Sequence, residues 1–277
     1  MNGDKFITDD DFYIDEKRVN HKWNMGNFHY HNSYEIYYLA EGNRKMLIQD
    51  RIYELKAGDI ILLRPDVLHR SMHSGSHMRI NIVFTDNFMS AYFTSSADAY
   101  LLSCFDAEFI RLNDNENEQV RKIFSELSNE YRANIPYFVD LAEILKLFIN
   151  AKARQDKEPL SRKDILSKVS LKINSVISYI GSHYSTITSI DEIADSCYIN
   201  KSYMCRLFKK ETGLTVFEYM NHIKIQQSCE MMKNTNDSIT YIAEKCGFSS
   251  ASYFSYAFKE IMDCSPSQFR KSQLKNV

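Results

Sequence analysis

A helix-turn-helix pattern occurs twice in the last third of this 277-residue chain. In the second copy, the first helix has an apolar face and ends at Gly247, which permits a left-handed turn. A second helix then begins at Ser249 or Ser250 and carries an aromatic face. Two helices joined by a short Gly-containing turn form the unit that places one helix in the DNA major groove. The defining positions are Ile239, Ile242, Ala243, Cys246, Tyr253, Phe254, Phe258 and Lys259.

The first copy lies 49 residues earlier and lacks one residue of the second copy's turn. Ser189 and Glu192 predict a capping box at its start. Its matching positions are Ile190, Ile193, Ala194, Cys197, Tyr203, Phe208 and Lys209. The alternative is that both copies are ordinary helical hairpins in a core. Two copies at a fixed spacing, each ending in Phe-Lys, favour the DNA-binding interpretation.

With these motifs, about the last hundred residues resemble the AraC-type transcriptional regulators. That family's second unit continues with Pro and an aromatic-Arg pair, here Pro266, Phe269 and Arg270. Three positions depart from its usual residues: Asp263 replaces a Gly, Val216 a Pro, and Lys224 an Arg in the connecting helix 217–232. The first two affect turns and the third a helix surface, so we expect the fold to be retained.

Charge differs between the two halves of the chain. Residues 1–160 carry 19 Lys and Arg against 25 Asp and Glu, whereas residues 161–277 carry 15 against 11. An acidic half joined to a basic half suits a sensing module attached to a nucleic-acid module. The chain lacks a signal peptide, a membrane span and a Cys-x-x-Cys pair, so we expect a cytoplasmic protein with six free cysteines.

The N-terminal half alternates with a period of two, which predicts short strands. We expect strands at 34–40 and 45–49 around a hairpin turn at 41–43, then strands at 51–55, 60–63 and 78–84. Frequent short strands with polar turns favour an antiparallel barrel or sandwich.

The spacing of His29, His31, Glu35 and Gly42 resembles the first motif of the cupin barrels, and Gly58 with His69 resembles the second. The match is incomplete, because Trp23, Arg64 and Asp66 stand where Gly, Pro and Gly are expected. The AraC-type family commonly carries a cupin-like sensor domain, so this resemblance agrees with the first.

Two imidazoles and a carboxylate can bind Fe, Mn or Zn. The alternative is a metal-free pocket, which sensor cupins of this family usually resemble, and we therefore expect no metal, no cofactor and no catalytic residue. The predicted ligand-binding residues are Trp23, His29, His31, Tyr37, His69 and Arg79. For Trp23 and Tyr37 the alternative is core packing, and for Arg79 a solvated strand position.

Two amphipathic helices are predicted after the barrel, at 115–134 and from Pro136 onward. The second carries an apolar stripe of Phe138, Leu141, Leu145, Phe148 and Ile149. This stripe either joins two subunits, as this family often does, or packs on its own barrel. We expect a homodimer formed by 115–152, and a charged linker at 153–170.

The expected fold is therefore α+β with two domains: a cupin-like antiparallel β-barrel at 1–114 followed by helices, and an all-α double helix-turn-helix domain at 171–277. The resemblance implies which residues face DNA: Lys201, Ser202, Cys205, Arg206, Lys209 and Lys210 in the first unit, and Ser250, Ser252, Ser255, Tyr256 and Lys259 in the second. Arg206 can bond guanine, and the lysines suit phosphate.

The chain is expected to be a transcription regulator that binds double-stranded promoter DNA, contacts RNA polymerase and senses a small molecule, with sugars as one class. One alternative is a metal-dependent cupin enzyme fused to a DNA-binding domain. The other is a regulator controlled by a protein partner without a small-molecule ligand.

Overall fold

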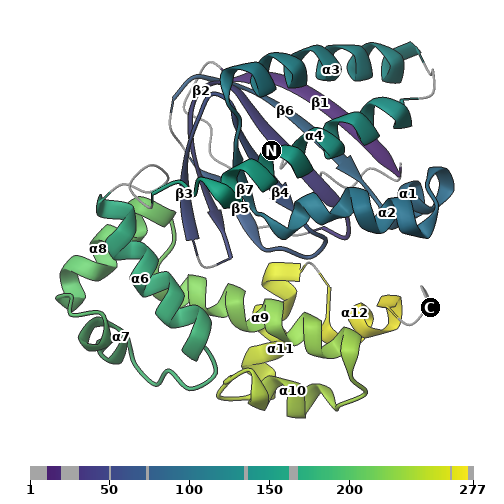
Figure 1. The fold of residues 1–277 in the computed structure, drawn as a ribbon. Coiled ribbons are helices and arrows are strands. Elements are labelled where there is room, and N and C mark those ends of the chain that lie inside the picture. Colours follow the sequence, from purple (N-terminus) through teal and green to yellow (C-terminus); the bar gives the residue numbers. More distant parts are fainter. Residues whose placement is uncertain are drawn as a thin grey trace. The chain divides into compact units, whose positions relative to one another are not determined.

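The computed structural model describes residues 11–19, 31–49, 51–72, 75–133, 137–161, 168–262 and 264–273. The chain divides into two compact units, one of residues 1–46 and 53–166, the other of residues 47–52 and 167–277. The first holds an antiparallel sheet with helices, and the second is helical (Figure 1). The chain is therefore an α+β protein, as the sequence predicts.

The sheet of the first unit has seven strands in its described part. Its path is β1-β6-β2-β4-β7, in which neighbouring strands are antiparallel, and β3 and β5 also pair with β2. The strands are β1 (Phe12–Val19), β2 (Tyr34–Ile48), β3 (Arg51–Lys56), β4 (Asp59–Leu63), β5 (His69–Met72), β6 (His77–Phe84) and β7 (Phe109–Arg111).

The hairpin predicted at 41–43 is wrong, because β2 is one continuous strand of 15 residues. Its pairing with β6 shifts register between Leu39 and Glu41, which marks a β-bulge. Gly42 then has a φ of 83°, and a Cβ at this position would lie 2.5 Å from the carbonyl oxygen of Ser76. The Gly-containing segment bends the strand against β6 and does not reverse the chain.

Short helices that the sequence did not predict follow β6: α1 (Asp86–Tyr92), α2 (Ser95–Leu102) and the 3₁₀ helix η1 (Ser103–Asp106). Thr85 and Thr94 cap α1 and α2 with side-chain oxygens that accept from Phe88 N and Ala97 N. Strands β1, β5 and β7 were not predicted either.

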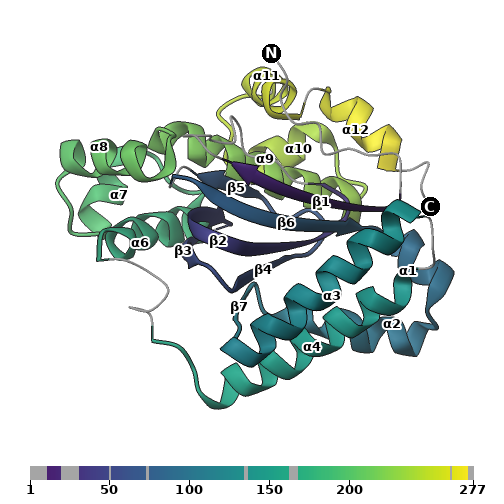
Figure 2. The ribbon, with the colours of Figure 1, turned by 90° about the horizontal axis from the view of Figure 1, so that it is seen from above.

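Two long helices, α3 (Asp114–Ala133) and α4 (Phe138–Lys157), lie side by side across one face of the sheet (Figures 1 and 2). Because side chains of a strand alternate, Ile36, Tyr38 and Ala40 of β2 all join the apolar core beneath these helices. Glu35 and Tyr37 therefore face the other side of the sheet.

The apolar stripe of α4 belongs to this core, which corrects the interface predicted from it. Leu141, Leu145 and Phe148 are fully buried within the subunit, and Phe138 and Ile149 pack against the same cluster. Helix α4 also continues to Lys157, past the start of the linker expected at 153.

The second unit is built around one long helix, α9 (Val216–Asn234). In Figure 1, the first helix-turn-helix lies toward one end of α9 and the second toward the other. The remaining helices are α6 (Lys168–His183), α7 (Ile190–Ser196), α8 (Lys201–Thr212), α10 (Ile239–Lys245), α11 (Ala251–Met262) and α12 (Pro266–Gln273). The duplicated pattern thus corresponds to α7–α8 and α10–α11.

Lys224 of α9 is buried, contrary to the expectation of a helix-surface position. Its Nζ donates a hydrogen bond of 2.6 Å to the carbonyl of Gly247 and lies 5.6 Å from the ring centre of Phe248. Burial lowers the pKa of this ammonium. The side chain fixes the turn of the second helix-turn-helix onto the connecting helix.

The two turns use the same backbone hydrogen bonds. Tyr198 N and Ile199 N donate to the carbonyls of Asp195 and Ala194, while Gly247 N and Phe248 N donate to those of Glu244 and Ala243. Tyr198 has a φ of 54° and Gly247 a φ of 75°, so both are left-handed. Tyr198 is 97% exposed, whereas a Cβ on Gly247 would lie 2.5 Å from the carbonyl oxygen of Ser185.

All six cysteines are free thiols, and Cys197 is only half-buried at the end of α7, not on a buried face. Within the described residues, no helix combines the length and apolar composition that crossing a bilayer requires.

These two turns should respond differently to substitution. Gly247→Ala should lower the free energy of unfolding by more than about 2 kcal/mol, because it adds a steric clash to a left-handed residue. Tyr198→Gly should change it by less than about 1 kcal/mol, because relief of strain offsets the entropy cost of glycine. Urea unfolding of both variants measures this. Equal losses would contradict the difference between the turns.

The facing carboxyls of α3 and α4 should make stability depend on pH. Burial, followed by the charge of Glu130, raises the pKa of Asp140 from 3.8 to about 6. A raised carboxyl pKa gives stability that is present at low pH and lost as pH rises through about 6. Asp140→Asn should therefore raise Tm relative to wild type at pH 7.5 more than at pH 5. The exposed-site variant Glu118→Gln is the control, and equal shifts at both pH values would rule the effect out.

Candidate nucleic-acid interface and buried polar site

Helix α8 exposes five of the six residues predicted for it to face DNA. Met204, Leu207 and Phe208 are buried on its inner face. The predicted residues Lys201, Ser202, Arg206, Lys209 and Lys210 are all exposed, which leaves them accessible to a ligand. Asn200 caps the helix by accepting from Tyr203 N at 3.1 Å, so the exposed face starts from a fixed position.

Helix α11 repeats this arrangement in the second helix-turn-helix. Phe254, Ala257 and Phe258 are buried. The predicted residues Ser250, Ser252, Ser255, Tyr256 and Lys259 are all exposed. Tyr256 is 62% exposed. The structure thus places two polar helix faces at equivalent positions of the two units.

Three of the predicted residues also have local structural partners. Lys201 Nζ lies 2.8 Å from a carboxylate oxygen of Asp191. Ser250 accepts a hydrogen bond of 3.1 Å from Tyr253 N and so caps α11, and Ser255 donates to the carbonyl of Ala251 at 2.9 Å. These contacts compete with DNA for the same polar atoms.

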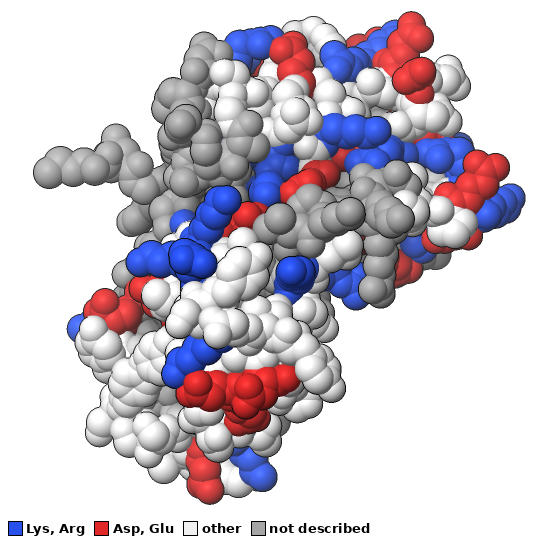
Figure 3. Space-filling view, turned by 90° about the vertical axis from the view of Figure 1, so that its left-hand side faces the viewer, with Lys and Arg blue, Asp and Glu red and all other residues white. Residues whose placement is uncertain are grey.

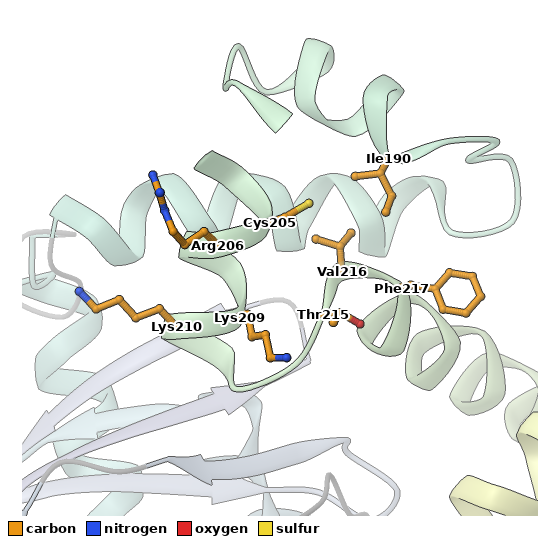
Figure 4. A pocket seen from close by; sticks show the side chains of 8 residues that line it. All are labelled: Ile190, Cys205, Arg206, Lys209, Lys210, Thr215, Val216 and Phe217. Carbon is orange, nitrogen blue, oxygen red and sulfur yellow. The ribbon is translucent and has the colours of Figure 1, made fainter. Parts of the chain in front are cut away.

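Cys205 is half-buried and does not project outward like its neighbours. It lines a pocket of about 550 Å³ between α8 and the start of α9. Figure 4 shows Cys205 beside Val216 and Ile190, while the charged ends of Arg206 and Lys210 extend away from them. The other lining residues are Lys209, Thr215 and Phe217. Cys205 therefore fits a packing role better than base contact.

Sequence reasoning missed the start of α9 as part of this surface. Thr215 caps α9, and Thr215 with Glu218 forms a complete capping box. Phe217 is 52% exposed at the pocket. The signal was present as Thr-x-x-Glu in the sequence. At Ser189, in contrast, the predicted box is partial, because Glu192 accepts from Thr188 N.

The face of the molecule in Figure 3 carries Lys and Arg interspersed with Asp and Glu among uncharged residues. On this face, basic side chains therefore lie close to acidic ones. Binding of a polyanion would depend on the local cations of α8 and α11.

The N-terminal part of the chain, which contains the sheet, holds a second group of candidate functional side chains. They lie on the face of the sheet opposite α3 and α4. His31 Nε2 lies 2.9 Å and His69 Nε2 3.3 Å from the same carboxylate oxygen of Glu35. The other oxygen of Glu35 accepts from Asn81 Nδ2 at 2.8 Å. Side-chain exposure is only 10% for His31, 7% for Glu35 and 2% for His69.

Charge pairing outweighs burial in this cluster. Burial alone would raise the pKa of Glu35, but hydrogen bonds from His31 and His69 hold it well below its usual range. Burial alone would lower the pKa of His31, but the hydrogen bond and charge of Glu35 raise it. The carboxyl is therefore ionised and attracts positive charge.

Two further arginines line this buried face. The predicted Arg79 is 3% exposed, so it is not a solvated strand residue, and it lies 3.1 Å from Asp15. Arg44, which sequence reasoning missed, is fully buried and donates to Ser71 Oγ at 2.7 Å. Burial raises the pKa of the predicted Tyr37 to about 12, so its phenol stays protonated.

Of the predicted ligand-binding residues, the structure brings His31 and His69 together and places Tyr37 and Arg79 on buried strand positions. Trp23 and His29 lie outside the described residues. Asn81 and Arg44 were missed; Asn81 is two residues from Arg79 on one strand, a spacing that predicts a shared face.

Family models match both parts of the chain. Residues 193–272 match a model described as a helix-turn-helix domain. Residues 19–149 match a model described as an AraC-like ligand binding domain. The first match covers both α8 and α11, and the second covers the buried polar cluster.

Curated relatives are similar along most of the chain. The Msm operon regulatory protein of Streptococcus mutans is 26% identical over 252 residues, or 88% of this chain and 86% of the relative. The HTH-type transcriptional activator RhaR of Mannheimia succiniciproducens is 23% identical over 249 residues, covering 89% and 88%. RhaS of Escherichia coli is 22% identical over 250 residues, covering 88% and 87%.

Solved structures give weaker likenesses. ToxT from Vibrio cholerae O395 aligns over 96% of this chain and 99% of its own, with 21% identity and a TM-score of 0.39. The DNA-binding domain of AdpA in complex with a target DNA aligns over 36% of this chain and 91% of its own, with 19% identity and a TM-score of 0.35.

Ser250 should stabilise the fold, whether or not it also contacts DNA. Ser250→Ala removes the side-chain cap of α11 and should lower the free energy of unfolding by about 1 kcal/mol. Ser252 lies in the first turn of α11 and does not cap it. Ser252→Ala should therefore change the free energy of unfolding by less than about 0.5 kcal/mol. Chemical denaturation compares them. An unaffected Ser250→Ala variant would show that the cap is dispensable.

Proposed function

Because the chain belongs to the AraC-type family of transcription regulators, we propose that a small molecule bound by its N-terminal domain controls its binding to promoter DNA. Membership makes it a DNA-binding regulator with a ligand-binding domain. The proposal adds which residues contact DNA and what the ligand-binding domain recognises.

The observation that carries the proposal is the pair of exposed polar helices attached to α9. A helix of 19 residues is about 28 Å long, and one turn of B-DNA is about 34 Å. If α8 and α11 are separated by about this length, they can enter two successive major grooves of one DNA face. The core contacts at both ends of α9 keep this separation constant.

The exposed residues divide into two roles. Arg206 can donate two hydrogen bonds to guanine, and Ser252 and Tyr256 can contact bases or sugar-phosphate. The ammonium groups of Lys209, Lys210 and Lys259 suit phosphate, which strengthens binding without choosing a sequence.

The effector is proposed to bind on the buried polar face of the sheet. That face carries donors in Arg79 and Tyr37 and an acceptor in the amide oxygen of Asn81, whose nitrogen donates to Glu35. A polyhydroxylated molecule such as a sugar matches a mixture of donors and acceptors. The ligand acts only if it prefers one domain arrangement over another.

The sequence predicts domain limits of 1–114 for the ligand-binding sheet, 115–152 for the helices, 153–170 for the linker and 171–277 for DNA binding. Because α4 ends at Lys157 and α6 begins at Lys168, the proposed linker becomes 158–167. A homodimer and contact with RNA polymerase complete the proposal. Since the α4 stripe is buried in the subunit, a dimer would have to use exposed residues such as Val139, which is 56% exposed.

The alternative of a metal-dependent enzyme is supported by one observation, the cluster of His31, Glu35 and His69. The named curated relatives are regulatory proteins, which favours a regulatory use of that cluster. Control by a protein partner has no observation of its own in its favour.

Substitutions on α8 test the proposal. Arg206→Ala should weaken binding to the preferred DNA by about 1–3 kcal/mol and relax selection at one base pair. Lys209→Ala should weaken binding to all DNA sequences alike and reduce the slope of log affinity against log salt by about one. Selection of DNA from a random library, followed by fluorescence anisotropy at several salt concentrations, measures both effects.

Lys245→Ala, an exposed lysine outside both recognition helices, is the matched control and should bind as wild type does. Unchanged base selection by Arg206→Ala would remove Arg206 from the reading residues. Absence of any sequence preference in the wild type would refute the DNA-contact assignment as a whole.

A further inference from the structure

We propose that the first helix-turn-helix holds a binding site for a small aromatic carboxylate or sulfonate, and that a molecule bound there excludes DNA. The site is the pocket of about 550 Å³ between α8 and the start of α9. It lies in the DNA-binding part of the chain and is separate from the effector site proposed on the sheet. The exclusion of DNA rests on the proposed function, whereas the binding of the ligand does not.

The lining of the pocket is mainly apolar. Val216 is buried, and the half-buried Cys205 and Ile190 lie beside it in Figure 4. Phe217 lines the same pocket with half of its surface in solvent. A ligand with an aromatic body would cover these side chains and remove apolar surface from water, which favours binding in proportion to the area.

The same pocket is also lined by cations. Arg206, Lys209 and Lys210 are all exposed, and no carboxylate lines the pocket within the described residues. The carboxylate of Glu218 accepts from Thr215 N at 2.7 Å and from Thr215 Oγ at 2.9 Å, so the helix cap holds it in place. These bonds and, to a lesser extent, the charge of Lys209 lower the pKa of Glu218. Three cations against this one carboxylate leave an excess of positive charge.

Lys209 is the cation best placed to pair with a ligand. Figure 4 shows its side chain extending toward Thr215, whereas the charged ends of Arg206 and Lys210 extend away from the apolar residues. A hydrogen bond from an ammonium group to an anion is stronger than one between neutral groups. Lys209 therefore supplies the direct contact, and the other two cations add to the positive potential around it.

The combination of an apolar lining and a cation selects the class of ligand. A volume of about 550 Å³ lies within the range of roughly 300–1,000 Å³ that small-molecule sites occupy. A neutral sugar brings no charge to Lys209, and a phosphodiester brings no apolar body to Phe217. An aromatic ring system with one carboxylate or sulfonate provides both contacts.

A ligand in this pocket would interfere with the proposed DNA contacts. Arg206 is proposed to contact guanine, and Lys209 and Lys210 are proposed to contact phosphate. An anion paired with Lys209 occupies the ammonium group that DNA would use, and its negative charge also repels the phosphates. The ligand would thus inhibit DNA binding by direct competition, without a signal from the ligand-binding domain.

Two fluorescent probes test the site in the full-length protein without DNA. The first, 8-anilinonaphthalene-1-sulfonate, combines aromatic rings with one sulfonate and fluoresces more strongly out of water. The second, N-phenyl-1-naphthylamine, has the same rings without the charge. Lys209→Ala should weaken binding of the sulfonate about tenfold and leave the neutral probe nearly unchanged. Phe217→Ser should weaken binding of both probes about tenfold.

Matched controls remove the same kinds of side chain elsewhere. Lys245→Ala and Tyr241→Ser change an exposed lysine and an exposed tyrosine of α10, and both should bind the probes as wild type does. Circular dichroism checks that each variant is folded.

The thiol of Cys205 reports the location of the bound probe in the wild-type protein. With the sulfonate at ten times its Kd, alkylation of Cys205 by iodoacetamide should slow about tenfold, because the thiol reacts only while the pocket is empty. Cys197 and Cys264, the other half-buried thiols, should react at unchanged rates. Mass spectrometry of the peptides measures each rate, and this result decides if a variant does not fold.

Competition with DNA completes the test. At the same probe concentration, the apparent Kd for dye-labelled DNA should rise about tenfold. No saturable probe binding, or undiminished binding by folded Lys209→Ala and Phe217→Ser with Cys205 unprotected, would overturn the site. Probe binding that protects Cys205 but leaves DNA affinity unchanged would overturn the exclusion of DNA. A wild type that binds the probe and no DNA would refute the proposed function and support the site.

Discussion

The geometry of the C-terminal unit depends on the packing of α9 into the cores of both helix-turn-helix units. The ring of Tyr219, near the start of α9, lies 5.5 Å from that of Phe208 in the first helix-turn-helix. Ile225, Cys229 and Met232 belong to the core of the second unit. Since a helix is stiff over this length, fixing both ends fixes the spacing and relative rotation of α8 and α11. Any side chain that reads DNA depends on these buried contacts for its position.

The N-terminal unit depends on a comparable constraint, the alternation of side chains along a strand. One face of β2 supplies Ile36 and Tyr38 to the core under α3 and α4, so the neighbouring residues must face the other side. The same strand can therefore be rich in apolar residues and still bring Glu35 and Tyr37 into a buried polar cluster. Burial without water makes each charge in that cluster expensive unless it is paired.

The sequence predicted the helical unit better than the sheet. A helix-turn-helix is defined by neighbours in sequence, so its turns, caps and apolar faces could be predicted at positions such as Gly247 and Ala243. The continuous β2 strand was not, because Gly42 serves equally well in a turn and in a bulge. Only pairing with β6, which is distant in sequence, decides between them. The stripe of α4 was ambiguous for the same reason, since periodicity identifies an apolar face but not its partner.

The candidate sites likewise differed in how far the sequence could predict them. The exposed residues of α8 and α11 were those that the family resemblance implied, except Cys205, which is half-buried. The approach of His69 to Glu35 required the sheet pairing, and the orientation of each imidazole depends on backbone carbonyls that no motif specifies.

The unequal turns have a consequence for how the duplicated unit can diversify. The first turn projects Tyr198 into solvent with room around it, and the second closes Gly247 against backbone. A new contact to a partner molecule can therefore arise at the first turn by exchange of one side chain. The second turn is closed to this route, because any side chain there must first displace the loop that contains Ser185. Two units of the same architecture thus differ in evolvability, and the first is the one able to acquire new surface chemistry.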